Sequence, residues 1–307
     1  MRKVLPGLLI GLGAFLVAVA IVALTWVPGH VERTPLDTDN VTALSGEAAV
    51  LGAPAGPVLG WSTNAIDADA STDDVAVWVT SLCVVHDEGG IDGCVPGSDK
   101  RLLSAETALF ATDRHTAMTV DNDGFVPEDT PQQEGLQNKW PFDAQKKTYP
   151  VWDDIVGEAV DAEYQGEDEI DGLTVYTYEY NADVDGVTLV GDISGRYVAT
   201  YTFYIEPRTG SIINQVVHQE RIANGDDTVL ELDLAFTDDQ VATNVDDANE
   251  ALATLTLMER TVPIVGLAVG IPVLLVGGVL LVLGRRKGKD TPSSPPASAE
   301  PKQPVGV

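Results

Sequence analysis

The stretches LTVYTYEYNA (residues 173–182) and YVATYTFYI (residues 197–205) decide the fold of this chain. Both alternate apolar or aromatic residues with polar ones and are rich in β-branched and aromatic side chains, as in a strand with one buried and one solvated face. Residues 74–85, 211–222 and 228–237 show a similar pattern. This part of the chain is therefore predicted to consist mainly of strands.

Turn-forming residues separate most of these strands: Asp171-Gly172, Asp185-Gly186, Asn224-Gly225 and the tetrapeptide PRTG at 207–210. Such pairs tolerate the backbone angles of tight turns, so consecutive strands are expected to pair antiparallel. A sheet of this kind must hide its edges. The predicted fold class is therefore mainly β, an antiparallel β-sandwich or partial barrel.

Two long apolar runs bracket this region, at residues 4–27 and 262–283. Each is long enough, at more than about 20 residues, to cross a bilayer as a helix. The first run could instead be a secretory signal, for which AVA at 18–20 is a weak cleavage site. Its apolar part is longer than the roughly 7 to 15 residues of a signal core, which favours an uncleaved anchor.

Basic residues set the expected orientation of these anchors. Arg2 and Lys3 precede the first run, and Arg285, Arg286 and Lys287 follow the second. Because such clusters stay cytoplasmic, the chain is predicted to be a two-pass plasma-membrane protein with both termini in the cytoplasm and its central domain outside.

The predicted order of segments follows from these observations. The helical stalk is predicted from acidic residues in its first turn and apolar residues at helical spacing, and the tail from its Pro-rich and Ser-rich composition. The segments are a cytoplasmic N-terminus at 1–3, a transmembrane helix at 4–27, an extracytoplasmic β-rich domain at 28–243, a helical stalk at 244–261, a transmembrane helix at 262–283 and a disordered cytoplasmic tail at 284–307.

The chain is strongly acidic, with 47 Asp and Glu against 18 Lys and Arg and a net charge of −29. This balance excludes nucleic acid as a partner, because a phosphate backbone would be repelled. Two explanations remain open: solubility in a saline or cation-rich exterior, which we favour, and binding of multivalent cations. The sequence DNDG at 121–124 is similar to the start of a calcium loop, but Phe125 stands where an oxygen ligand belongs.

Cys83 and Cys94 are the two cysteines of the chain, and glycines lie between them. A reversal there would bring the two thiols together, so a disulfide is predicted. The motifs G-x-S-x-G, H-E-x-x-H, the Walker loop and a G-x-G-x-x-G following a strand are missing from the sequence. We therefore expect a protein that is not an enzyme and has no catalytic residues, no cofactor and no metal site.

The stretch KWPFDAQKKTYPVWDD (residues 139–154) gathers basic and aromatic residues in this acidic chain. Its prolines argue against a helix or a central strand, so its aromatic rings are expected to pin an irregular loop onto the sheet. The alternative is a ligand mouth with a basic patch beside an apolar cavity. The candidate ligand-binding residues are Lys139, Trp140, Phe142, Lys146, Lys147, Tyr149 and Trp152.

The same stretch and those that follow it resemble an actinobacterial membrane-protein family, the PorA porin family, earlier known as a domain of unknown function. The resemblance extends over nearly the whole chain, both anchors included. The matching positions are Trp140, Pro141, Phe142, Tyr149, Pro150, Trp152, Asp153, Tyr164, Gly166, Gly172, Leu173, Tyr176, Pro207, Thr209 and Gly210.

The resemblance implies a role in cell-envelope biogenesis in mycolate-containing bacteria. The expected function is an anchored binding protein that holds or hands on an envelope glycolipid or lipoglycan precursor. The alternative is a structural partner of an envelope lipid transporter or glycosyltransferase. A porin is the least favoured function, because transmembrane barrels need strands with lipid-facing apolar bands.

Overall fold

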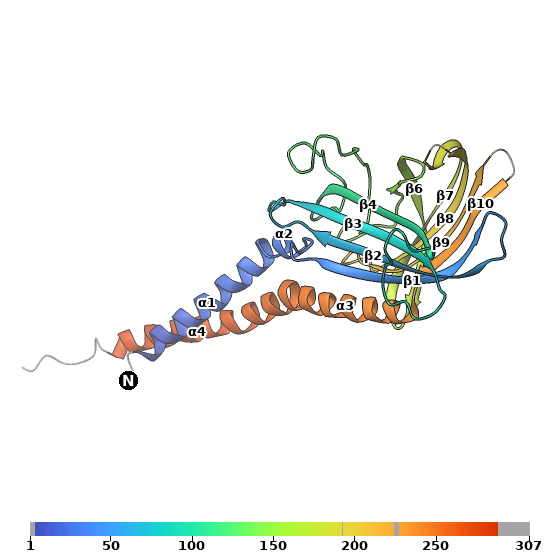
Figure 1. Ribbon diagram of the computed structural model, residues 1–307. Coiled ribbons are helices and arrows are strands. Elements are labelled where there is room, and N and C mark those ends of the chain that lie inside the picture. Colours follow the sequence, from blue (N-terminus) through green and yellow to red (C-terminus); the bar gives the residue numbers. More distant parts are fainter. Residues whose placement is uncertain (1–3, 192, 224–226, 288–307) are drawn as a thin grey trace, which may run out of the picture. The chain divides into compact units, whose positions relative to one another are not determined.

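The computed structural model describes residues 4–191, 193–223 and 227–287 (Figure 1). The chain divides into two compact units. One holds Gly29–Leu255 and is built around a β-sheet. The other holds the described parts of Met1–Pro28 and Thr256–Val307 and is helical.

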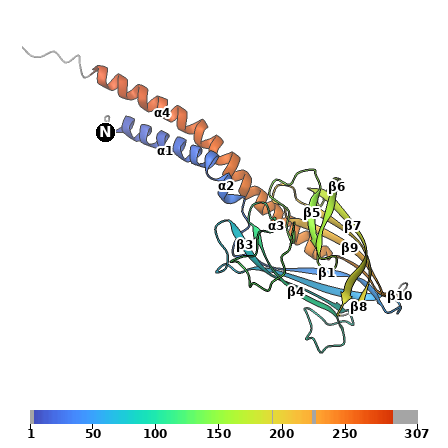
Figure 2. The ribbon, with the colours of Figure 1, turned by 90° about the horizontal axis from the view of Figure 1, so that it is seen from above.

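In the described residues of the β unit, ten antiparallel strands form one sheet that curls on itself (Figure 2). This confirms the predicted mainly β fold and its partial-barrel form. The strand order is β4-β3-β2-β1-β10-β9-β8-β7-β6-β5. The strands are β1 (Asp39–Val50), β2 (Gly56–Ile66), β3 (Val75–His86), β4 (Leu102–Asp113), β5 (Tyr149–Asp153), β6 (Glu158–Ile170), β7 (Leu173–Val190), β8 (Ile193–Ile205), β9 (Ile212–Ala223) and β10 (Asp227–Phe236).

The turn predictions had different outcomes. Asp171 and Gly172, with φ of 48° and 84°, join β6 to β7 as predicted. The turn predicted at Asp185-Gly186 is wrong, because β7 runs through it as far as Val190. Gly186, with φ of 78°, instead marks a bulge where the register against β8 shifts. The pair Asn224-Gly225 lies outside the described residues.

The inner face of the curled sheet carries most of the core. One cluster centres on Trp140, Tyr178 and Phe203, and a second on Leu44, Val84 and Leu232. Tyr201 packs against both, so the two clusters form one continuous apolar interior. Successive side chains of a strand point to opposite faces, so the strand residues next in sequence to these core residues form the outer face.

Helix α3 (Asp238–Thr256) covers part of the outer face. Its Val245 and Ala248 pack against Leu173 and Ile213. The helix begins at Asp238, earlier than the predicted stalk. Two aspartates in its first turn interact favourably with the partial positive charge of the helix N-terminus. As far as Leu255 the helix therefore belongs to the β unit instead of standing apart as a stalk.

The long connection between β4 and β5 joins the two edges of the sheet by backbone hydrogen bonds. On one side, the Val120 N–H donates to the Ala111 carbonyl at 2.9 Å. On the other, the Leu136 N–H donates to the Pro150 carbonyl at 2.8 Å. Between them, Thr119 donates to Gly135 at 3.0 Å. These bonds occupy backbone groups that an open sheet would leave at its edges.

The helical unit pairs α1 (Leu5–Thr25) with α4 (Val262–Lys287), and a π-turn, η1 (Leu257–Thr261), precedes α4. Both long helices are long and apolar enough to cross a membrane. Glycines let them approach closely: a Cβ on Gly13 would lie 2.7 Å from the Leu274 backbone nitrogen, and one on Gly266 would lie 2.9 Å from the Ala20 Cβ. Small residues at such positions are typical of helix pairs in membranes.

The predicted N-terminus at 1–3 and residues 288–307 of the tail predicted at 284–307 lie outside the described residues, and residues 284–287 belong to α4. The short helix α2 (Pro28–Val31) follows α1 in the chain.

Candidate functional site

The stretch at 139–154 lies across the inner face of the sheet and sends part of its aromatic set into the core. Trp140 is fully buried, with its ring centroid 4.8 Å from that of Phe203 and 5.4 Å from that of Tyr178. Its backbone N–H donates to the Gly210 carbonyl at 2.9 Å. Trp140 therefore fastens the stretch to the turn between β8 and β9.

The other aromatic residues occupy different environments. Tyr149 is buried, and its hydroxyl accepts the Gln145 backbone N–H at 2.9 Å. Trp152 is half-buried on the opposite face of β5, where its Nε1 donates to the Asp154 carboxylate at 2.7 Å. Phe142 stacks on His115 with the ring centroids 5.9 Å apart. This division fits the expected loop anchor, with Trp140 and Tyr149 as the buried anchors.

The three lysines do not share one environment. Lys146 forms an ion pair of 2.8 Å with Glu167 and lies over the Tyr176 ring. Lys147 is exposed and its Nζ lies 4.9 Å from the Tyr149 ring centroid. Lys139 is turned inward and donates to the Thr209 carbonyl. Binding of a ligand by these seven residues stays a prediction.

Lys139 has the most perturbed electrostatics of the stretch. Its Nζ lies 4.1 Å from the centroid of the Phe142 ring. Burial lowers the pKa of Lys139 to about 7, and the nearby Glu206 opposes this effect. Glu206 is itself buried and accepts hydrogen bonds from Thr209. An amine in this setting is partly neutral near pH 7.

A buried carboxylate, Asp153, lies at the end of the same stretch. Oδ2 of Asp153 accepts the hydroxyls of Tyr180 at 3.0 Å and Tyr197 at 3.2 Å. Burial raises the pKa of both tyrosines, and it raises the pKa of the neighbouring Tyr201 to about 12. The tyrosine hydroxyls therefore remain protonated donors to Asp153 at physiological pH.

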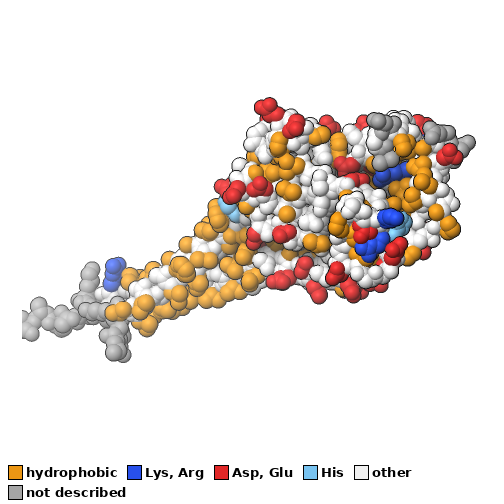
Figure 3. Space-filling model, viewed as in Figure 1, with side chains coloured by type: hydrophobic (Ala, Val, Ile, Leu, Met, Phe, Trp, Pro, Cys, Tyr) orange, Lys and Arg blue, Asp and Glu red, His pale blue; other side chains and the backbone are white. Residues whose placement is uncertain are grey.

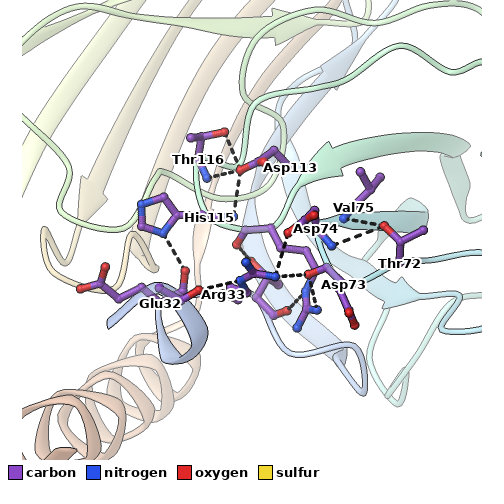
Figure 4. A network of polar contacts seen from close by, with 12 residues as sticks. Glu32, Arg33, Thr72, Asp73, Asp74, Val75, Asp113, His115 and Thr116 are labelled. Atoms are coloured by element: carbon purple, nitrogen blue, oxygen red, sulfur yellow. Dashed lines mark hydrogen bonds and ion pairs between the residues drawn. The ribbon is translucent and has the colours of Figure 1, made fainter. Parts of the chain in front are cut away.

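A second polar network joins the start of the β unit to the loop before β3 and the loop after β4 (Figure 4). Arg33 and Arg114 both donate to the Asp73 carbonyl, at 2.5 and 2.9 Å, and Arg33 also pairs with the Asp74 carboxylate at 2.8 Å. The Glu32 carbonyl lies 2.7 Å from Nδ1 of His115. These contacts fix the residues that follow α2 onto the ends of β3 and β4.

The network also reaches the turn between β8 and β9. Arg208 pairs with the Glu32 carboxylate at 2.9 Å and with that of Asp143. Sequence reasoning missed Glu32, Arg33, Arg114 and Arg208, because they come from segments far apart in the chain and share no local motif. The predicted disulfide is confirmed: Cys83 and Cys94 are bonded, with their Cα atoms 5.9 Å apart.

Among the described residues, no group of three or more His, Cys, Asp or Glu side chains is placed to hold a metal ion. The geometry at 139–154 and at the Arg33 network is that of fastened loops.

A family model described as Porin PorA matches residues 5–279, which include most of both long helices and the whole β unit. The chain belongs to the PorA family. A curated relative, Porin PorA of Corynebacterium amycolatum, is 33% identical over 91 residues, which are 26% of this chain and 24% of the relative. The match therefore spans about a quarter of that relative's length.

These matches correct the function expected from the sequence. The prediction of an anchored protein that holds an envelope glycolipid or lipoglycan precursor is wrong, and so is the alternative prediction of a structural partner. The family and the relative are both named as porins, which are channel-type proteins, and neither match supports a role in lipid binding or envelope biogenesis. The prediction that a porin is the least favoured function is corrected as well.

Proposed function

We propose that this PorA-family chain is a membrane-anchored subunit of a channel-type assembly that lets small solutes cross a membrane. The observation that carries the proposal is the family match over residues 5–279, which takes in most of both apolar helices as well as the β unit. A single family thus includes the anchor and the exterior domain together.

The chain is a membrane protein with two candidate spans, and we propose that both of its ends lie in the cytoplasm. The basic residues Arg2 and Lys3 flank α1, and Arg285 lies at the end of α4. Such clusters stay on the cytoplasmic side, which leaves the β unit outside.

Cysteine labelling tests this orientation. A cysteine in place of Asn122 should react with an impermeant thiol reagent in intact cells, since the native cysteines are joined in a disulfide. One in place of Asp290 should react only after the membrane is permeabilised. Labelling of both in intact cells would overturn the two-pass orientation.

The packing of each unit supports a path formed between copies of the chain. Inside the curled sheet, Tyr178 and Tyr197 are fully buried in the core, and the outer face of β9 and β10 carries carboxylates such as Glu220 and Asp233. Transmembrane barrels have the reverse pattern, with an apolar outer band and a polar interior. The sheet is therefore suited to water outside and not to lipid.

The helix pair also lacks a polar lining of its own. Leu5–Thr25 contains no charged residue, and residues 262–284 contain none either. Gly13 and Gly270 bring the two helices into close backbone contact. One copy therefore offers no water-filled path through its helices, and several copies are needed to enclose one.

Single-channel recording tests the proposal. The full chain, purified in detergent and added to a planar lipid bilayer, should produce stepwise increases in conductance. Gly270→Leu should abolish them, because a Cβ at Gly270 already lies 3.0 Å from side-chain atoms of Leu16 and Val17. Protein that inserts into the bilayer without conducting would refute the channel function.

A further inference from the structure

The outer face of the sheet has a charged half and a neutral half. On β7, β8, β9 and β10, the outer face carries ionisable side chains: Asp183, Arg196, His218, Glu220, Glu231 and Asp233. On β1 to β4, the outer-face positions between Asp39 and Glu47 of β1, and those before Asp113 of β4, are uncharged. We call this surface the neutral face and define it by Val41, Trp61, Thr63, Val79, Ser81 and Leu109.

The strand register places these six residues side by side. Thr63 lies between Val41 on β1 and Ser81 on β3, and Val79 on β3 pairs with Leu109 on β4. Their sequence neighbours, such as Trp78 and Phe110, point to the inner face and belong to the core. The six side chains therefore form one continuous patch on the outside.

The neutral face is accessible. Val41 is 57% exposed and Val79 is 49% exposed, and the other four side chains of the face are half-buried. Acidic residues dominate the rest of this unit: residues 29–255 hold 44 of the 47 Asp and Glu but 10 of the 18 Lys and Arg. Red atoms are accordingly spread over much of the face of the β unit that Figure 3 shows.

We propose that the neutral face is the surface on which a second copy of this chain packs, neutral face to neutral face. The inference rests on the proposed function, which requires several copies of the chain. It adds to that function the identity of the partner and the surface of contact. Two units of such strong negative charge repel one another, and carboxylates buried between them would lose their hydration. Contact at the neutral face keeps carboxylates out of its centre, with Asp39 and Glu47 at its edge.

The chemistry of the face suits this partner. The centres of protein interfaces are depleted of charged residues, as this patch is. Two β-sheets pack face to face about 10 Å apart when their facing side chains are apolar or small. Valine, threonine and serine at the centre of the patch allow that distance, and Trp61 and Leu109 add apolar area to bury.

The test uses the full chain in detergent and measures its mass by light scattering corrected for bound detergent. Wild-type protein should be dimeric or larger. Val79→Glu should weaken association by about tenfold or more, since each interface would then bury two carboxylates. Val41→Glu tests the same face at a more exposed position. Circular dichroism checks that each variant keeps its strands.

Val216→Glu is the matched control. Val216 is 40% exposed on β9, next to His218, in the charged half of the outer face. This change should leave the mass unaffected. A wild-type chain that is monomeric, a folded Val41→Glu or Val79→Glu that associates normally, or an equal effect of Val216→Glu would overturn the inference.

The two proposals can fail separately. If the chain associates through the neutral face but does not conduct, the channel function falls and the interface remains. If the wild-type chain conducts while Val41→Glu and Val79→Glu retain its association and conductance, the interface is refuted and the channel function stands.

Discussion

The hydroxyl of Tyr180 donates a 3.0 Å hydrogen bond to Oδ2 of Asp153, inside the curled sheet where Asp153 is 3% exposed. The other carboxylate oxygen accepts the backbone N–H groups of Ile155 and Val156 at 2.9 and 3.0 Å. With Tyr197 as a fourth donor, the carboxylate satisfies groups from β7, β8 and the turn after β5. It joins an edge strand of the sheet to two central ones.

Asp153→Ala should therefore destabilise the β unit by about 3 kcal/mol or more, because several buried donors lose their acceptor at once. Asp161→Ala, at an exposed position on the neighbouring β6, should change stability by less than about 0.5 kcal/mol. Urea unfolding followed by tryptophan fluorescence measures both. Equal midpoints for the two variants would show that the carboxylate does not hold the strands together.

Replacing Trp140 or Trp152 by alanine should lower the free energy of unfolding by very different amounts. Trp140→Ala removes a fully buried ring and should cost about 3 to 5 kcal/mol. Trp152→Ala removes a half-buried ring and should cost clearly less. Trp140→Phe should be tolerated better than Trp140→Ala, because the Trp140 Nε1 has no hydrogen-bond partner among the described residues and an aromatic ring is retained.

The same urea unfolding experiment, applied to all three tryptophan variants, decides this point. The large loss is expected at Trp140 because its ring is fully buried, whereas that of Trp152 is half-buried. If Trp152→Ala proved as costly as Trp140→Ala, the stretch would be anchored differently from the packing described above.

The disulfide should contribute about 2 to 3 kcal/mol to stability, as expected for a short closed loop. Cys83→Ala together with Cys94→Ala should lower the midpoint of unfolding without changing the strand content. Reduction of the wild-type disulfide should shift the midpoint by a similar amount, which provides the matched control. If neither treatment lowers the midpoint, the loop does not gain stability from the bond.

The strands foreseen from sequence are those with the densest β-branched and aromatic residues, as in 173–182 and 197–205. β1 and β2 were missed because Gly46, Gly60 and several alanines dilute their pattern, and β6 because acidic residues interrupt its alternation on both faces. These strands are stabilised by their neighbours in the sheet more than by their own propensity. Local sequence does not contain that information.

The candidate site shows the same limit. Proline and aromatic residues at 139–154 predicted an irregular loop pinned to the sheet, which holds for residues 139–148, whereas Tyr149–Asp153 forms the edge strand β5. The partners that give the loop its chemistry come from other parts of the chain. Glu206 lies 67 residues after Lys139 in the sequence, and the tyrosines around Asp153 lie on other strands. Their convergence depends on strand register, which a single sequence does not fix.

Lys139 should make the stability of the β unit depend on pH. Burial lowers the pKa of Lys139 to about 7 in the folded protein, against 10.5 for an ordinary lysine. Between these values the unfolded chain binds more protons at this site than the folded one, so the contribution of Lys139 to stability rises as the pH increases from about 7 to 10. Below pH 7 the amine is charged in both states, so the free-energy cost of burying it no longer changes with pH.

Comparison with Lys139→Met isolates this contribution, because methionine has a side chain of similar length that is apolar and does not titrate. The difference in unfolding free energy between wild type and variant should shift in favour of wild type as the pH rises from 7 to 10. Lys147→Met, at an exposed position, should show no such trend. A difference that stays constant over this range would mean that Lys139 keeps an ordinary pKa, and that its amine reaches water instead of the Thr209 carbonyl.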